Sequence, residues 1–185
     1  MKNEPYQNLI LFGYKSSGKT FFGSLLAQEL EIPFIDTDQI IEKLYKKEFR
    51  EECNCRQISI KMGEAAFRIL EERVIDELNE VTNTIIALGG GAVLSFENCL
   101  KLKKLGRLVY LEADKETIKN RIFSDGIPSF LDPINHKKSF EIMYEQRRTI
   151  YEKVSSLKIK LHGKTDQQIL DELKSLMNRV QPSNT

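Results

Sequence analysis

The sequence predicts an α/β fold built on a five-stranded parallel sheet with helices on both faces. Five short apolar runs lie along the 185-residue chain, and each is long enough for a buried strand. Segments with helical spacing of apolar residues separate these runs, and such alternation is typical of a parallel sheet. A glycine-rich loop follows the first run and precedes the first helical segment, which is the order found in phosphate-binding sites.

The first strand is expected at residues 9–12, where the unbroken apolar run fits a strand that is buried on both faces. Further strands are expected at 32–36, 84–88, 107–111 and 157–161. Helices are expected where apolar residues recur every three or four positions. These segments are 20–30, 39–47, 63–78, 98–105, 115–123, 137–154 and 165–178.

Two stretches lack a clear periodicity of apolar residues. Residues 46–62 are charged, and we expect a loop with a short helix there. Residues 124–136 contain two prolines, a glycine and several Asp or Asn residues, which indicates a long loop. Together the elements predict one domain over residues 1–185, with a flexible tail at 181–185.

Composition argues against several kinds of partner. The 28 basic and 27 acidic residues leave a net charge of +1, so no general field would attract nucleic acid or a membrane surface. There is no apolar run of roughly 18 residues and no signal-peptide pattern, and we expect a cytoplasmic protein. Cys53, Cys55 and Cys99 have no histidines at ligand spacing, so they indicate ordinary thiols rather than a zinc site.

The glycine-rich loop reads Gly-x-x-x-x-Gly-Lys-Thr, the signature of a nucleoside triphosphate site. Its glycines let backbone N–H groups curl around a polyphosphate, and the positive end of the following helix faces the same anion. Lys19 would neutralise the outer phosphates, and the Thr20 hydroxyl would ligate Mg²⁺. The residues expected to bind ATP are Gly13, Ser16, Ser17, Gly18, Lys19, Thr20 and Phe21. The alternative is a glycine-rich turn without a ligand.

Two further groups follow strands, and ligands bind at the carboxyl ends of strands in such sheets. Asp36 and Asp38 come after the second strand. One could hold Mg²⁺ through water while the other meets an acceptor hydroxyl, or Asp38 could simply cap the next helix. Gly89, Gly90 and Gly91 come after the third strand, where they could let a substrate approach the backbone or form a tight turn. This gathering of groups at one sheet edge indicates an enzyme.

Two arginines lie on or beside apolar helical faces. Arg147 falls in the middle of the apolar stripe of its helix, so it needs an anionic partner, either a structural carboxylate or a substrate carboxylate. Its neighbour Arg148 falls off the edge of that stripe. Arg68 lies at the edge of the apolar stripe of its helix, and Glu64 and Glu71 lie about one turn away. A surface salt-bridge cluster is therefore as well supported for Arg68 as a role in binding a ligand.

Five motifs, in order and at similar spacing, resemble those of the shikimate kinases. They are Gly13-x4-Gly18-Lys19-Thr20, Asp36-Thr37-Asp38, Gly63-Glu64-x2-Phe67-Arg68-x2-Glu71, Gly89-Gly90-Gly91-Ala92-Val93 and Arg147-x3-Tyr151. The resemblance covers nearly the whole chain. It implies a P-loop fold like that of the nucleoside monophosphate kinases, with a helical substrate-binding subdomain at 38–67 and a lid at 124–136.

The resemblance also implies an activity. A shikimate kinase transfers the ATP γ-phosphate to the 3-hydroxyl of shikimate in the pathway to chorismate and the aromatic amino acids, and members act as magnesium-dependent monomers. Asp38 would contact the accepting hydroxyl, and Arg68 and Arg147 would bind the shikimate carboxylate. The glycine run at 89–91 would line the shikimate site.

On the nucleotide side, the resemblance assigns the phosphates to Lys19. Thr20 would bind Mg²⁺ directly, and Asp36 would bind it through water. Arg121 resembles a family arginine that lies near the nucleotide, and we expect it to contribute to catalysis.

The lid departs from the family pattern. Members usually carry an arginine immediately before Pro-Leu-Leu, where it contacts the transferring phosphate, but Ile127 precedes Pro128 here. Arg121 could compensate, and Lys137 and Lys138 are weaker candidates.

Two smaller departures are Ala87, where members often have a hydroxyl, and the longer stretch at 46–62.

The rival functions are another P-loop small-molecule or nucleoside monophosphate kinase, and a catalytically silent nucleotide-binding scaffold. The set of Asp38, Arg68 and Arg147 favours a hydroxylated carboxylate as the acceptor.

Overall fold

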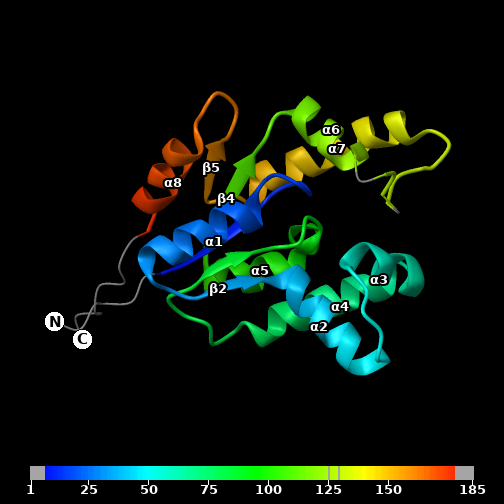
Figure 1. The fold of residues 1–185 in the computed structure, drawn as a ribbon, viewed down its shortest axis with the longest axis horizontal. Coiled ribbons are helices and arrows are strands. Elements are labelled where there is room, and N and C mark those ends of the chain that lie inside the picture. Colours follow the sequence, from blue (N-terminus) through cyan, green and yellow to red (C-terminus); the bar gives the residue numbers. More distant parts are fainter. Residues whose placement is uncertain (1–6, 125, 129, 178–185) are drawn as a thin grey trace.

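Five parallel strands form one sheet in the order β2-β3-β1-β4-β5. The computed structural model describes residues 7–124, 126–128 and 130–177. The strands are β1 (Asn8–Phe12), β2 (Phe34–Asp36), β3 (Ile85–Ala87), β4 (Gly106–Glu112) and β5 (Leu157–Lys160). All five predicted strands are present, so the predicted parallel α/β sheet is confirmed (Figure 1).

Helices cover both faces of the sheet. They are α1 (Lys19–Leu30), α2 (Thr37–Phe49), α3 (Cys55–Met62), α4 (Glu64–Glu77), α5 (Phe96–Leu105), α6 (Lys115–Ser124), α7 (His136–Val154) and α8 (Asp166–Ser175), with one 3₁₀ turn, η1 (Ala92–Leu94). Side chains of α1 and α8 pack on one face, and those of α5, α6 and α7 pack on the other. In Figure 1, α3 lies at the same end of the molecule as the loop between α6 and α7.

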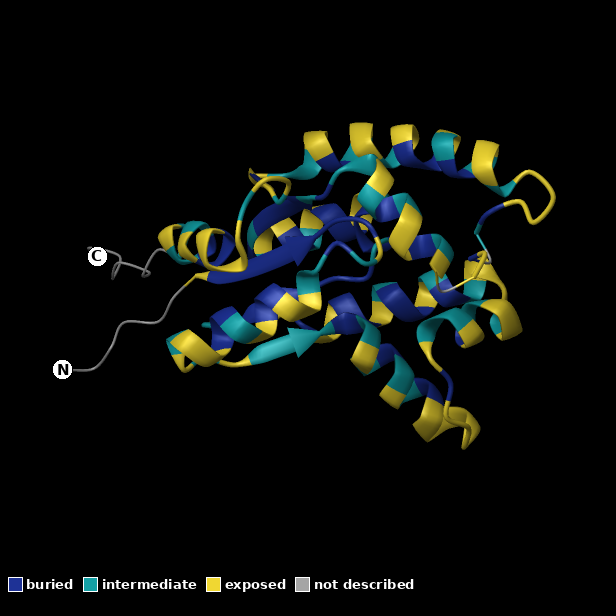
Figure 2. Cartoon of the chain, turned by 45° about the horizontal axis from the view of Figure 1, so that its top comes forward, coloured by how far each residue is buried: buried dark blue, intermediate teal, exposed yellow. Residues whose placement is uncertain are grey.

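Strand β1 shows why the middle of this sheet needs an unbroken apolar run. Leu9 and Leu11 pack with side chains of α1 and α8, whereas Ile10 and Phe12 pack with the helices on the opposite face. All four side chains are buried, and the central strands are dark blue in Figure 2. Burial on both faces fixes the register of the strand, because a shift by one residue would exchange the two sets.

The helix after β2 is longer than its apolar pattern predicts. It begins at Thr37 rather than near Gln39. The Asp36 carboxylate explains the early start, because it accepts hydrogen bonds from the backbone N–H groups of Asp38 and Gln39 and so caps the helix. The alternative role considered for Asp38, as the helix cap, is therefore wrong.

The stretch 46–62 is also more helical than expected, since it contains the end of α2 and the whole of α3. A reciprocal capping box of Asn54 and Gln57 begins α3. Ile58 is fully buried and packs in a small core with Tyr45 and Phe67, separate from the two cores against the sheet. This small core holds α2, α3 and α4 together.

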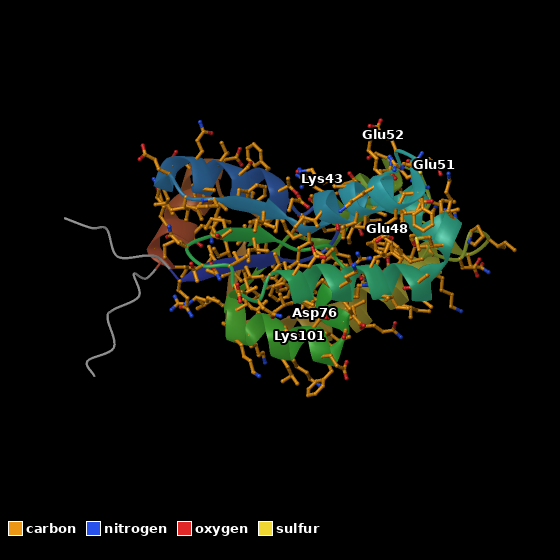
Figure 3. The ribbon with its side chains drawn as sticks, turned by 90° about the horizontal axis from the view of Figure 1, so that it is seen from below. Lys43, Glu48, Glu51, Glu52, Asp76 and Lys101 are labelled. Atoms are coloured by element: carbon orange, nitrogen blue, oxygen red, sulfur yellow. The ribbon has the colours of Figure 1, made fainter. Side chains whose placement is uncertain are left out.

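Ion pairs connect the loop between α2 and α3 to both helices. Glu51 pairs with Lys61, and Glu52 pairs with Lys46. Figure 3 shows Glu51 and Glu52 at the outer edge of the molecule. Exposed pairs of this kind contribute little stability each, so the buried core around Ile58 does most to hold α3 in place.

No helix in the described part of the chain has the length and apolar character needed to cross a membrane. The tail predicted at 181–185 lies outside the described residues, as do residues 125 and 129 of the predicted lid.

Candidate active site

A pocket of about 710 Å³ opens at the carboxyl ends of β1, β2 and β3. Most of the predicted site residues line it. They are Ser16, Gly18, Lys19, Thr20, Phe21, Asp36, Asp38, Arg68, Gly89, Gly90, Gly91 and Arg147. Gly13, Ser17 and Arg121 do not line it. The fold therefore brings together side chains from the glycine-rich loop and from α2, α4 and α7, with the backbone of the glycine run.

The glycine-rich loop leads directly into α1. Gly18 has a φ of 93°, in the left-handed region that glycine adopts without strain, and the helix begins at the next residue. The Lys19 ammonium donates hydrogen bonds to the carbonyl oxygens of Gly13 at 3.2 Å and Tyr14 at 2.8 Å. Burial lowers the pKa of Lys19 to about 8, although nearby carboxylates oppose the shift. An anion beside this desolvated ammonium would raise its pKa again, so the loop favours an anionic ligand.

Tyr14 connects this loop to α7. Its hydroxyl donates to the carbonyl oxygen of Tyr144, and the two rings stack with centroids 4.5 Å apart. Burial raises the pKa of Tyr14, so the hydroxyl remains protonated and able to donate. The same helix carries Arg147, so the position of the phosphate loop and the position of that arginine depend on one element.

Thr20 and Asp36 present two oxygens side by side. The Thr20 hydroxyl donates to a carboxylate oxygen of Asp36 at 2.6 Å, while the other oxygen of Asp36 caps α2. Both residues line the pocket. Hydroxyl and carboxylate oxygens are the ligand type that Mg²⁺ prefers, and this ion needs only one or two from the protein when phosphates and waters supply the rest.

Asp38 lies in the first turn of α2 and lines the pocket. Burial raises the pKa of its carboxyl, and Asp36 and Glu42 act in the same direction, whereas Lys19 and Lys15 oppose the shift. A carboxylate with a raised pKa is a better proton acceptor than an exposed one. The position of Asp38 therefore suits a group that takes a proton from a ligand in the pocket.

The glycine run makes room for functional side chains. A Cβ atom at Gly89 would lie 2.6 Å from a carboxylate oxygen of Asp38, and one at Gly91 would lie 1.9 Å from a guanidinium nitrogen of Arg68. The hydroxyl of Thr37, between the two aspartates, accepts a hydrogen bond of 3.0 Å from the backbone N–H of Gly89. The sequence suggested room for a substrate or a tight turn, but the closest neighbours of two of these glycines are protein side chains.

Arg68 is more than part of a surface cluster. It binds the exposed Glu64 at 3.1 Å, and it also pairs with Glu71, whose side chain is only 4% exposed. Burial raises the pKa of Glu71, and the Arg68 guanidinium opposes that shift. Because Glu71 lies in the pocket wall, it holds Arg68 at the pocket rather than over bulk solvent.

Arg147 is half-buried and lines the same pocket. Its guanidinium carbon lies 4.9 Å from the centre of the Phe130 ring, a cation–π contact. In the described part of the chain no carboxylate forms a salt bridge with Arg147, whereas Arg148 pairs with Glu145 at 3.1 Å on the surface. The structural carboxylate that the sequence allowed for Arg147 is not found among the described residues, and its positive charge borders the pocket.

The sequence patterns indicated no role in the site for Phe130 or Tyr151, and Glu71 was considered only as part of a surface salt-bridge cluster. The Tyr151 hydroxyl donates to the carbonyl oxygen of Gly90 at 2.6 Å and so positions the glycine run. Glu71 and Tyr151 each follow a site arginine by about one helical turn, and this spacing was the available signal. Phe130 carried no such signal, because its contact with Arg147 depends on the path of a loop.

Arg121 lies outside the main pocket. It borders a second hollow of about 230 Å³, together with Ser17 and residues of the turn before α8. Its guanidinium donates to the carbonyl oxygen of Ser16 at 2.9 Å. Arg121 is thus placed behind the phosphate loop and not above the pocket.

The cysteines do not form a cluster with other ligand types. Among the residues that the structure describes, no three His, Cys, Asp or Glu side chains gather closely enough to hold a metal ion by themselves. Cys55 borders the pocket, where its thiol donates to the carbonyl oxygen of Asp38 at 3.3 Å. Burial raises the pKa of Cys55, so the thiol stays protonated.

Comparison with known proteins identifies one family. The sequence profile described as "Shikimate kinase" matches residues 15–178. A shikimate kinase of Alkaliphilus oremlandii is 36% identical over 169 residues, which cover 90% of this chain and 96% of that protein. A shikimate kinase of Bacillus cereus is 36% identical over 175 residues, which cover 93% of this chain and 99% of that protein.

A solved structure agrees with this result. The shikimate kinase of Acinetobacter baumannii, in complex with shikimate, matches with a TM-score of 0.82 and 28% sequence identity. The match covers 94% of this chain and 93% of the other.

Proposed function

The chain belongs to the shikimate kinase family, and we propose that the pocket at the carboxyl ends of β1, β2 and β3 is where it carries out the reaction of that family. It is an ATP-dependent phosphotransferase that acts on shikimate. The observation that supports the location best is the convergence of Lys19, Asp38, Arg68 and Arg147 on one pocket. These groups supply, in order, a charge for phosphates, a proton acceptor and two guanidinium groups for a carboxylate.

The donor side of the proposed site is the glycine-rich loop. We assign the ATP phosphates to the backbone of this loop, to the start of α1 and to Lys19. Ser17 of the loop borders the hollow beside Arg121, and we assign the nucleoside end of ATP to this hollow. Arg121 would then bind nucleotide rather than act on the phosphate in transfer.

The acceptor side lies between α4, α7 and the glycine run. Arg68 and Arg147 would bind the shikimate carboxylate, since guanidinium groups pair with carboxylates through two parallel hydrogen bonds. Residues of α2, α3 and the start of α4, within 38–67, would form the substrate-binding subdomain. Pro128 and Phe130, from the lid at 124–136, also border the pocket and would exclude water from it.

The proposed chemistry is a direct transfer. The oxygen of the shikimate 3-hydroxyl forms a bond to the γ-phosphorus of ATP, while the bond from that phosphorus to the β–γ bridging oxygen breaks, which gives shikimate 3-phosphate and ADP. The proton of the hydroxyl passes to Asp38. Because such transition states are loose, the enzyme acts mainly by aligning the reactants and by neutralising charge.

The oxygens of Thr20 and Asp36 fit Mg²⁺, and we propose that these two residues hold the ion, Asp36 through water. When bound, the ion neutralises phosphate charge. We also propose a monomer, as the resemblance to the shikimate kinases implies. We place this monomer in the cytoplasm, where ATP is supplied.

A direct assay tests this function. Purified protein with MgATP is expected to release ADP when shikimate is added, and to release much less with quinate or AMP as the acceptor, because AMP has no carboxylate and quinate has an additional hydroxyl on the carbon that bears its carboxylate. The measurement is ADP release by a coupled assay. Release that does not depend on shikimate would refute the proposal.

A further inference from the structure

The predicted lid carries no positively charged lysine or arginine anywhere in residues 124–136. Phosphoryl transfer needs positive charge around the phosphoryl group, because negative charge accumulates on its oxygens in the transition state. The residues suggested above as substitutes do not reach the pocket. Arg121 borders the second hollow, while Lys137 and Lys138 are exposed at the start of α7 and do not line the pocket.

Arg56 of α3 brings a positive charge to the pocket at the lid. It is half-buried, it lines the pocket, and it donates a hydrogen bond to the carbonyl oxygen of Ile127. Its guanidinium also lies 3.5 Å from the place that a Cβ atom at Gly126 would occupy. A side chain from the substrate side of the pocket therefore contacts the lid at the residue immediately before Pro128.

The position of Arg56 is well defined by its helix. The capping box begins α3 one residue before Cys55, and Ile58 buries the opposite side of the helix in the core with α2 and α4. Two other cations of the pocket have defined contacts of their own, because Arg68 pairs with Glu71 and Lys19 binds carbonyl oxygens of the phosphate loop.

We propose that Arg56 is a further catalytic residue of this enzyme, and that it supplies from α3 the guanidinium that the lid lacks. Held by the Ile127 carbonyl, it contacts the oxygens of the phosphoryl group in transfer and neutralises their charge. A guanidinium has five N–H donors in a planar fork, so one group can serve more than one acceptor. The inference rests on the function proposed above, since it concerns the same transfer.

The test compares steady-state kinetics of Arg56→Ala, Arg56→Lys and the double variant Arg56→Ala/Ile127→Arg with wild type. Arg56→Ala is expected to lower kcat at least ~10-fold, with the KM values for shikimate and ATP within about threefold of wild type, because the lost contact forms in the transition state. Arg56→Lys should retain part of kcat. The double variant should recover at least ~3-fold in kcat over Arg56→Ala, since it places a guanidinium on the lid residue whose carbonyl Arg56 binds.

Arg73→Ala is the matched control, because Arg73 pairs with Glu48 on the surface and does not line the pocket. Its kcat should equal that of wild type. The inference is overturned if Arg56→Ala keeps kcat within about twofold of wild type, if its loss lies wholly in the KM for shikimate, or if Ile127→Arg gives no recovery. Failure of the proposed function is distinguishable, because wild type itself would then show no shikimate-dependent ADP release.

Discussion

Replacing Asp38 by Asn is expected to lower kcat at least ~100-fold, because the amide cannot accept the proton of the shikimate hydroxyl. The KM for shikimate should stay within about threefold of wild type, since the guanidinium groups that bind its carboxylate are unchanged. The side chain keeps its size, so neither Gly89 nor the capped start of α2 needs to move. The measurement is ADP release at saturating MgATP over a range of shikimate concentrations.

Asp76→Asn provides the control for Asp38→Asn. Asp76 lies on α4 and pairs with Lys101 on the surface (Figure 3), so the same chemical change there should leave kcat unaltered. The melting temperature of Asp38→Asn should not fall, because a neutral amide is less costly to bury than a carboxylate. If Asp38→Asn keeps more than about a third of kcat, Asp38 is not the proton acceptor.

Replacing Arg147 by Ala is expected to raise the KM for shikimate at least ~30-fold, which corresponds to about 2 kcal/mol for the loss of one partner from a buried charge pair. Arg147 lines the pocket, and no carboxylate pairs with it in the described part of the chain, so its charge is directed to a ligand. The KM for ATP should change little. Initial rates at varied shikimate, with MgATP held constant, measure the effect.

Arg148→Ala is the matched control for Arg147→Ala. Arg148 is the next residue of the same helix, but it is exposed and pairs with Glu145. Its loss should leave the KM for shikimate within about twofold of wild type. Equal effects of the two substitutions would show that overall charge, and not the position of Arg147, determines shikimate binding.

Local patterns in the sequence predict the sheet and the phosphate loop because both depend on near neighbours. The unbroken apolar run of β1 requires burial on both faces, and the spacing from Gly13 to Thr20 is set by the wrapping of one short loop. The apolar stripe of α7 likewise predicts that Arg147 faces inward, and the pocket confirms this direction.

Other features depend on contacts between distant segments, and periodicity cannot reveal them. Asp36 rather than Asp38 caps α2 because β2 ends at Asp36, and no local pattern in the sequence determines where that strand ends. The need for glycine at 89 and 91 comes from side chains of α2 and α4. The contact between Arg56 and Ile127 joins residues 71 positions apart, through a loop whose path no local pattern determines.

The central claim is that this pocket recognises the carboxylate of its acceptor through Arg147 and presents the acceptor hydroxyl to Asp38. The most direct measurement is the ratio of kcat/KM for shikimate to kcat/KM for its methyl ester, in wild type and in Arg147→Ala. Wild type should favour shikimate at least ~30-fold, and Arg147→Ala should reduce that ratio at least ~10-fold, because the ester has no charge to pair. A wild-type enzyme that uses both compounds equally well, or a ratio that Arg147→Ala leaves unchanged, would contradict the claim.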